Sequence, residues 1–149
     1  MRNSKLLQRE DGVKITVITV NFNNLNGLKR TIPSVFSQTY NQYEYIIVDG
    51  GSTDGSKEYI EQYLPLIDEW VSEPDKGVYN AMNKAIKMAH GEFCIFMNSG
   101  DHFYSPTVLD EVLPSLNDAD IYTGYTLRIG DKQVDIWAPP AELDMHFMM

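Results

Sequence analysis

The sequence predicts an α/β fold, in which a Rossmann-like, doubly wound and mostly parallel sheet is flanked by helices. Strand patterns and helix patterns alternate from residue 14 to residue 97, as right-handed crossovers between parallel strands require. Each strand pattern also ends in a polar corner, and parallel strands bring such corners to one rim of the sheet, where α/β proteins place their ligands. The four corners are Asn21, Asp49-Gly50-Gly51, Ser72-Glu73 and Asn98-Ser99-Gly100-Asp101.

Four strands are expected in this sheet. The first is rich in Ile, Val and Thr and lacks a clean polar alternation, which favours a central strand covered on both faces. The others are short apolar runs bounded by turn residues. The expected strands are Lys14–Val20, Tyr43–Val48, Glu69–Ser72 and Glu92–Met97.

Three helices are expected between these strands. Apolar residues at helical spacing predict one over Asn24–Gln38, and Pro33 inside it predicts a kink or a late start, because proline lacks a backbone donor. The second helix is expected to take its N-cap from Ser52-Thr53-Asp54 and to run to about Tyr63. The third is expected to stop at His90-Gly91. Its apolar face is Val78, Met82, Ala85 and Ala89.

The segment after residue 100 is less regular. It predicts a short helix over Pro106–Leu113 and three strands, the last two joined by a turn at Gly130-Asp131 and extending the sheet as an antiparallel edge. These strands are Asp120–Thr126, Leu127–Ile129 and Gln133–Trp137. Residues 1–13 are expected to be a flexible lead-in, 14–137 a single domain, and 138–149 an irregular tail in which the chain is cut short.

Composition narrows the class of protein. The chain has 149 residues, 43% of them apolar, which is enough for one core. Twelve basic and twenty-one acidic residues give a formal net charge of −9, which disfavours nucleic acid and anionic lipid as partners. No apolar run approaches the ~20 residues of a membrane span, and residues 1–12 lack the apolar core of a secretory signal.

A cytoplasmic location is therefore expected, with peripheral attachment at the inner face of the membrane as an alternative. The sequence leaves open whether the protein forms a homodimer. Cys94 is the one cysteine and lies in an apolar run. With no second cysteine to pair with it, a buried structural thiol is expected.

The segment Asp49–Ser56 is the first candidate site. Two glycines directly after a strand allow a sharp turn and the close approach of a ligand, and the Asp49 carboxylate can accept N–H or O–H donors such as a uracil or ribose edge. The spacing fits neither the Rossmann glycine fingerprint nor a phosphate-binding P-loop. For Ser52, Thr53 and Asp54 the sequence favours ordinary helix caps, whereas for Asp49 it favours ligand binding.

The turn Asn98-Ser99-Gly100-Asp101 is the second candidate site. Carboxylate and amide oxygens close together suit Mg²⁺ or Mn²⁺, which would keep open positions for a diphosphate. Taken alone, the tetrapeptide is an ordinary turn sequence. Its position after the fourth strand is what favours a site.

Six segments resemble, in order, the nucleotide-sugar-binding half of family 2 glycosyltransferases, which have the GT-A fold. The resemblance implies that Thr19, Val20 and Asn21 border the nucleotide and that Asp49 contacts the base. It places Lys76 and Asn83 near the diphosphate, and Asn98, Ser99 and Asp101 in the metal region, with Asp101 as the metal ligand. The six segments are Ile15–Asn23, Ser34–Tyr40, Ile47–Ser56, Ser72–Gly77, Ala81–Ala85 and Phe96–Asp101.

The resemblance implies an inverting transfer of a sugar from a nucleoside-diphosphate sugar, expected to be a UDP-sugar. The acceptor would be a hydroxyl of a glycan or lipid-linked acceptor in bacterial cell-surface polysaccharide synthesis. Many members carry Asp-Ser-Asp-Asp where this chain has Asn98-Ser99-Gly100-Asp101, so a single carboxylate is retained and weaker metal binding is expected.

The catalytic base is not assigned from the sequence. The family's base is an acidic residue well downstream of the metal motif, and no downstream carboxylate lies in a matching motif. The available carboxylates are Asp120, Asp131, Asp135, Glu142 and Asp144. A non-catalytic nucleotide-binding module is therefore one alternative. A sugar nucleotidyltransferase is another, although it would need a glycine-rich basic loop where this chain has Asn21-Phe22-Asn23-Asn24.

Overall fold

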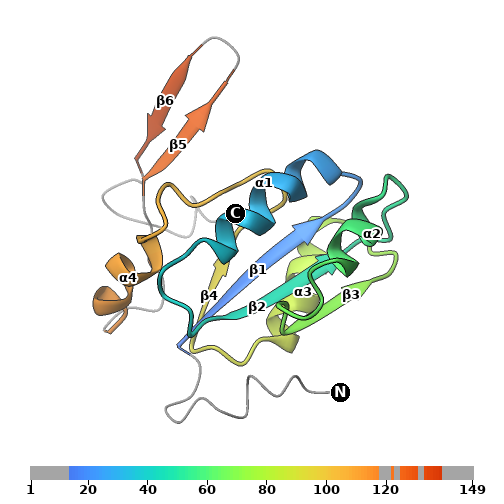
Figure 1. Ribbon diagram of the computed structural model, residues 1–149, viewed down its shortest axis with the longest axis horizontal. Helices are drawn as coiled ribbons and strands as arrows, with labels where there is room; N and C mark the ends of the chain where they lie inside the picture. The colour runs from blue at the N-terminus through green and yellow to red at the C-terminus, as the bar shows by residue number, and fades with distance from the viewer. Residues whose placement is uncertain (1–13, 118–121, 123–124, 131–132, 139–149) are drawn as a thin grey trace. The chain divides into compact units, whose positions relative to one another are not determined.

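The computed structural model describes residues 14–117, 122, 125–130 and 133–138 (Figure 1). The chain divides into two compact units, one ending at Asp110 and the other beginning at Glu111. The first unit holds the sheet and three long-range crossovers, and the predicted α/β alternation is confirmed there. The prediction of one domain over 14–137 stays a prediction.

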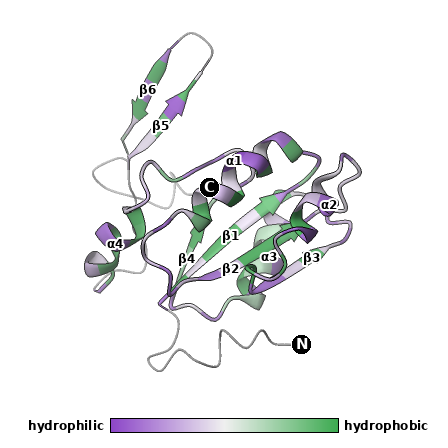
Figure 2. Ribbon diagram, viewed as in Figure 1, coloured by the Kyte–Doolittle hydropathy of each residue, from purple (hydrophilic) through white to green (hydrophobic). Residues whose placement is uncertain are grey.

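The central sheet has four parallel strands in the order β3-β2-β1-β4. Strands β1 and β2 lie in the middle and are buried along their whole length, and Figure 2 shows them as largely hydrophobic. Their runs of Ile and Val suit strands that helices cover on both faces. The strands are β1 Ile15–Asn21, β2 Glu44–Asp49, β3 Glu69–Ser72 and β4 Phe93–Phe96.

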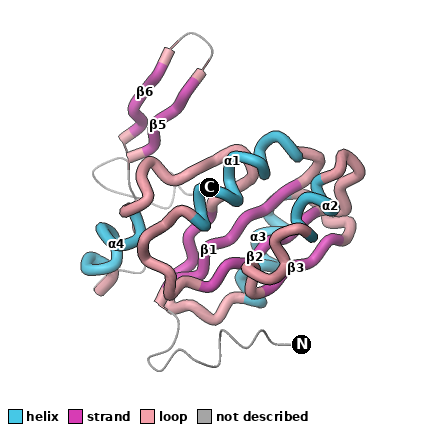
Figure 3. Tube along the Cα trace, in the orientation of Figure 1, coloured by secondary structure: helices cyan, strands magenta, loops and turns pink. Residues whose placement is uncertain are grey.

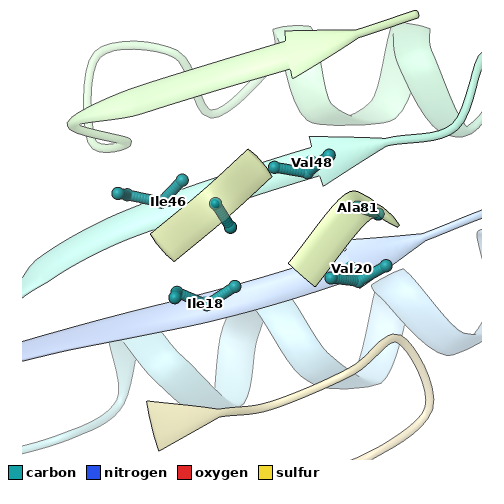
Figure 4. Close-up of a cluster of buried hydrophobic side chains, with 6 residues drawn as sticks. Ile18, Val20, Ile46, Val48 and Ala81 are labelled. Atoms are coloured by element: carbon teal, nitrogen blue, oxygen red, sulfur yellow. The ribbon is translucent and has the colours of Figure 1, made fainter. Parts of the chain in front are cut away.

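Helix α3, Val78–Met88, covers one face of the sheet. Its Ala81 lies beside Val20 of β1 and Val48 of β2 (Figure 4), in a buried cluster that also holds Ile18, Ile46 and Ala85. Alanine is small enough to let the helix axis approach the strands closely, so this layer is tight. Burying each Ile or Val side chain contributes about 1.5–3 kcal/mol.

Helices α1, Leu25–Phe36, and α2, Ser56–Glu61, lie on the opposite face (Figure 1). The ring of Phe36 in α1 meets Tyr45 of β2 edge-on at 5.5 Å and stacks on Tyr63 at 5.8 Å. The predicted apolar stripe of α1 is confirmed as its buried face. The resulting three layers form the doubly wound arrangement that the sequence predicts.

Pro33 lies inside α1, and the expected late helix start is wrong. The carbonyl left without a partner by proline belongs to Lys29, four residues earlier. Lys29 and Pro33 are both exposed, so that carbonyl faces water and the helix continues through the proline.

Two predictions about helix ends need correction. Helix α2 begins at Ser56 behind Gly55, which is left-handed with φ 91°, so Ser52 and Thr53 are not caps, while Asp54 does accept a hydrogen bond from the Ser56 N–H at 3.0 Å. Val78, predicted to face the core, is 48% exposed. Val78 is the first residue of α3 and lies outside the buried cluster, to which the helix contributes Ala81 and Ala85.

Cys94 is exposed, so the prediction of a buried thiol is wrong. Strand β4 pairs only with β1 among the described residues, and a strand with one neighbour leaves part of its surface open. Desolvation and the nearby Glu44 carboxylate raise the pKa of the thiol.

The second unit contains a hairpin of β5, Thr126–Ile129, and β6, Val134–Trp137. The predicted last two strands are confirmed as a pair. Among the described residues they pair with each other and not with the main sheet, so for these two strands the predicted extension of that sheet is wrong. The turn closes locally through the Gly130 N–H and the Gln133 carbonyl at 2.9 Å. The expected strand from Asp120 lies mostly outside the described residues.

A short helix, α4, spans Val108–Val112 and is followed by a 3₁₀ turn, η2, at Leu113–Ser115. The predicted helix over Pro106–Leu113 is confirmed with a later start. Within the described part of the chain, every helix is too short or too polar to cross a membrane.

Candidate functional site

A pocket of about 650 Å³ lies at the carboxyl-terminal rim of the sheet. Loops leaving β1, β2, β3 and β4 all reach this rim, as the tube in Figure 3 lets the reader follow. Strand order reverses between β1 and β4, and such a switch point is where open α/β sheets bind ligands. The pocket is lined by Val20, Asn21, Phe22, Gly50, Gly51, Pro74, Asp75, Gly77, Val78, Asn98 and Ser99.

Asp49 lies at the centre of the rim and is completely buried. Its Oδ1 accepts from Asn21 Nδ2 at 2.7 Å and from Ser52 Oγ at 2.5 Å. Its Oδ2 accepts from the Gly51 and Ser52 N–H groups at 3.2 and 2.9 Å, and from Ser72 Oγ at 2.7 Å. Burial alone would raise the pKa of Asp49, but these hydrogen bonds outweigh it and hold the pKa below its usual value.

These bonds join the loops after β1, β2 and β3 into one rigid frame. Ser52 Oγ also accepts from the Asn23 N–H at 2.8 Å, and Asn23 Oδ1 accepts from the Thr53 N–H at 2.9 Å. The Asp54 carboxylate accepts from the Leu25 N–H, the first residue of α1, at 2.8 Å. The polar residues that follow β2 therefore hold the β1–α1 loop in place.

The turn after β4 is held by α1. Thr31 Oγ1 accepts from the Gly100 N–H at 2.9 Å and donates toward the Asp101 carbonyl at 2.7 Å. Asn24 Nδ2 donates to the Ser99 carbonyl at 2.8 Å. A Cβ at Gly27 would lie 2.7 Å from the Gly100 nitrogen, so only glycine at that position lets the helix approach the turn this closely.

Several oxygens at the rim have no hydrogen-bond partner among the described residues. Asn21 Oδ1 and Asn98 Oδ1 are buried and accept no hydrogen bond, and an unsatisfied buried acceptor costs about 1–3 kcal/mol. Within the described ranges, no side chain pairs with the exposed Asp101 carboxylate. Asn21 and Asn98 both line the pocket, so a small rearrangement of their amide groups would bring these oxygens to a ligand that carries N–H donors or a cation.

A hard divalent cation fits the turn Asn98–Asp101 in donor type. An open carboxylate and an orphaned amide oxygen, three residues apart around a left-handed Gly100 (φ 111°), are the ligands that Mg²⁺ and Mn²⁺ prefer. No group of three or more His, Cys, Asp or Glu side chains that could hold a metal occurs among the described residues. Most of the coordination would therefore come from a bound phosphate and water.

The residues predicted from sequence fall into three groups. Four line the pocket: Val20, Asn21, Asn98 and Ser99. Asp101 follows them in the turn after β4. The other four are not among the lining residues: Thr19, Asp49, Lys76 and Asn83.

Those four differ in how they are placed. Thr19 is buried beneath the rim, where its hydroxyl contacts the Met97 carbonyl at 2.8 Å and the Tyr45 hydroxyl at 2.9 Å. Asp49 is enclosed by its five donors. Lys76 and Asn83 are exposed to solvent. The predicted ligand contacts of all nine residues stay predictions.

Sequence reasoning missed Phe22, Asp75 and Val78 as pocket residues. The signal for Asp75 was present, because Asp followed two residues later by Gly forms an Asx turn, and its Oδ1 accepts from the Gly77 N–H at 2.8 Å. Of the carboxylates considered as the catalytic base, Asp135 is exposed in β6 and accepts from Gln133 Nε2 at 2.5 Å. The others, Asp120, Asp131, Glu142 and Asp144, lie outside the described residues.

Fold and rim together define an α/β protein with a ligand pocket at the switch point of a parallel sheet. Comparison with known families gives the particular class. The model of the family described as Glycosyl transferase family 2 matches residues 16–147. The chain belongs to this family, as the resemblance of its six segments implies.

Two relatives illustrate the similarity. An uncharacterized glycosyltransferase of Mycobacterium tuberculosis, Rv1514c, is 41% identical over 104 residues, which are 69% of this chain and 40% of the relative. The putative teichuronic acid biosynthesis glycosyltransferase TuaG of Bacillus subtilis is 32% identical over 123 residues, 78% of this chain and 48% of TuaG. The chain thus spans less than half the length of these relatives.

Solved structures show the same fold. S. aureus TarS 1-349 in complex with UDP superposes with a TM-score of 0.62 at 26% identity, covering 68% of this chain and 31% of TarS 1-349. The mannosyltransferase PcManGT from Pyrobaculum calidifontis, in complex with GDP-Man and Mn²⁺, gives a TM-score of 0.63 at 24% identity, covering 70% of this chain and 32% of that one. The chain has the GT-A fold.

Proposed function

We propose that this chain binds the nucleoside diphosphate of a sugar donor in the pocket at the β1–β4 switch point. The observation that carries the proposal is that two residues of the pocket lining, Asn21 and Asn98, have amide oxygens that accept no hydrogen bond among the described residues, in a chain that belongs to a glycosyltransferase family. The S. aureus TarS fragment with the same fold is known with UDP, which supports a uridine nucleotide. The rigid frame around Asp49 would hold the pocket in shape before the ligand arrives.

The diphosphate would lie at the turn after β4, on the side of the pocket formed by Asn98 and Ser99. Asp101 and Asn98 would hold a Mg²⁺ or Mn²⁺ ion, which when bound neutralises negative charge on the departing diphosphate. Thr31 and Asn24 fix the turn, so its oxygens need little reorganisation on binding. The net charge of −9 makes a cation between the protein and the phosphates more necessary.

The reaction proposed for the whole protein is an inverting transfer of the sugar to an acceptor hydroxyl. A carboxylate base outside the residues assigned here would take the acceptor proton as the hydroxyl attacks the anomeric carbon. The name of TuaG supports an acceptor in cell-surface polysaccharide synthesis, either a glycan or a lipid-linked acceptor. The pocket residues of this chain would bind and orient the donor.

Isothermal titration calorimetry with UDP and MnCl₂ tests the donor and metal assignments together. We expect the wild type to bind UDP more tightly with Mn²⁺ than without it. In Asp101→Ala, the affinity for UDP in the presence of Mn²⁺ is expected to fall at least about tenfold, as when a charged contact is removed. Glu92→Ala is the matched control, because Glu92 precedes β4 at the opposite end of the strand. Equal Mn²⁺-dependent affinity in wild type and Asp101→Ala would contradict the metal assignment.

A further inference from the structure

The space above Gly50 is filled by side chains from two other loops. A Cβ built on Gly50 would lie 2.8 Å from Asp75 Oδ2 and 3.1 Å from Phe22 Cδ2. Gly51 has a positive φ of 81°, but Gly50 does not, so position 50 does not need glycine for its backbone. What matters at Gly50 is the missing side chain, which lets Asp75 reach into the pocket.

The Asp75 carboxylate is held in a fixed orientation. Its Oδ1 accepts from the Gly77 N–H at 2.8 Å, which closes a turn within the β3–α3 loop. Its Oδ2 has no hydrogen-bond partner among the described residues and lies over Gly50 on the pocket wall. Asp75 thus presents one oriented acceptor to a ligand.

The ring of Phe22 lies beside this acceptor. Phe22 is 63% exposed although it lines the pocket. A flat apolar face next to a fixed oxygen suits a planar heterocycle that stacks on the ring and donates an N–H from its edge. A nucleobase has both features.

The position of Asp75 also decides which end of a nucleotide it meets. Gly50 follows β2, whereas Asn98 follows β4, and β1 lies between these two strands. Neighbouring strands are about 4.8 Å apart, so the two sides of the pocket are about 10 Å apart. A carboxylate repels a diphosphate unless a cation lies between them. The proposed cation lies with Asn98 and Asp101, so the phosphates belong on that side and the base belongs on the Asp75 side.

We infer that Asp75 selects the nucleobase, by accepting the ring N–H of uracil (N3–H) or of guanine (N1–H) at Oδ2. Cytosine and adenine present an unprotonated ring nitrogen at that position, which faces the carboxylate unfavourably. This inference rests on the proposed function, since it needs a nucleotide in this pocket. The sequence leads us to expect that Asp49 contacts the base. Because five donors enclose its carboxylate, its role is instead to hold the loops around the pocket in place.

Calorimetric titration of the full chain with UDP, GDP, CDP and ADP, each with MnCl₂, tests this inference. We expect UDP or GDP to bind at least about tenfold more tightly than CDP and ADP, the range of one charge-assisted hydrogen bond. The UDP and GDP titrations decide between the two bases. Asp75→Asn keeps an oxygen for the Gly77 N–H and turns Oδ2 into a donor, so it is expected to remove this preference and to improve binding of CDP.

Gly50→Ala is a second variant that leaves Asp75 in place. Its methyl group would displace the Asp75 carboxylate and is expected to reduce the same preference. Glu92→Gln removes one carboxylate from the opposite end of β4 and is expected to keep wild-type selectivity. Circular dichroism confirms that each variant is folded.

Different results overturn different claims. Equal binding of all four nucleotides by the wild type, or an unchanged preference in Asp75→Asn, would overturn the role of Asp75 and leave the proposed function standing. Failure of the wild type to bind any of the four would overturn the proposed function itself, and this inference with it.

Discussion

Replacing Asp49 by Asn tests whether the rim is held together by a buried carboxylate. Asn keeps the shape of Asp but has one acceptor oxygen, whereas Asp49 accepts from five donors. If the remaining oxygen of the new side chain accepts from the Gly51 and Ser52 N–H groups, then its NH₂ group faces Asn21 Nδ2. Both groups are donors, so no hydrogen bond forms between them. One buried donor loses its partner, which costs about 1–3 kcal/mol, and the remaining hydrogen bonds are weaker because their acceptor is no longer charged. We therefore expect Asp49→Asn to lower the free energy of unfolding by about 2–4 kcal/mol.

The size of this effect is expected to depend on pH in a defined direction. The pKa of Asp49 is lower in the folded chain than its ordinary value of 3.8. A lowered carboxylate pKa gives stability that is fully present above the ordinary value and is lost as the pH falls through the folded value. Asn cannot titrate, so the difference between wild type and Asp49→Asn is expected to shrink below about pH 4.

Urea denaturation followed by circular dichroism, at pH 7 and at steps down to pH 3, measures both effects through the free energy of unfolding. Comparing the two proteins at each pH removes the contribution of the other carboxylates, which they share. A difference below about 0.5 kcal/mol at pH 7, or one that grows as the pH falls, would refute the role assigned to Asp49.

Three further predictions concern other parts of the first unit. Glu44 is completely buried, so Glu44→Ala is expected to lower the free energy of unfolding by about 3 kcal/mol in a urea titration. The control Glu92→Ala, at an exposed position, is expected to lower it by less than about 1 kcal/mol, and equal losses in the two variants would contradict the prediction. Thr31→Val leaves the Gly100 N–H without its acceptor, and a loss of about 1–3 kcal/mol by thermal denaturation is expected, whereas an unchanged midpoint would show that the turn needs no brace. The raised pKa of Cys94 lowers its thiolate fraction, so its alkylation by iodoacetamide at pH 8 is expected to be slower than that of glutathione, and a faster reaction would contradict the shift.

The parallel sheet could be predicted because its signals are local. The two central strands are rich in Ile and Val, the two outer ones are short runs between turn residues, and the predicted strand Glu69–Ser72 has the observed bounds. Alternation with amphipathic segments then fixes the order of the layers, since crossovers have one hand. The effect of Pro33 could not be predicted in the same way, because it depends on whether that face of the helix is exposed, and exposure is set by the tertiary packing.

The site could be predicted only to the level of the rim. Asn21, Asn98 and Ser99 line one pocket because their strands end at the same edge of the sheet, while their contacts with a nucleotide stay predictions. The sequence does not show that both carboxylate oxygens of Asp49 accept hydrogen bonds from four neighbouring residues. Because Asp49 is enclosed in this way, Asp75 is the carboxylate that faces the pocket. Whether a carboxylate is enclosed or open depends on contacts between loops, and no spacing within one segment records those.

The central claim is that a nucleoside diphosphate binds at the carboxyl-terminal rim of the sheet. Backbone amide chemical shifts, measured by NMR during titration with UDP and Mg²⁺, test it most directly. We expect the largest shift changes at four pocket residues, Phe22, Gly51, Gly77 and Ser99. Glu44 begins β2 and His90 follows the end of α3, so both lie at the end of the sheet away from the rim. Shift changes that concentrate at these two residues would contradict binding at the rim.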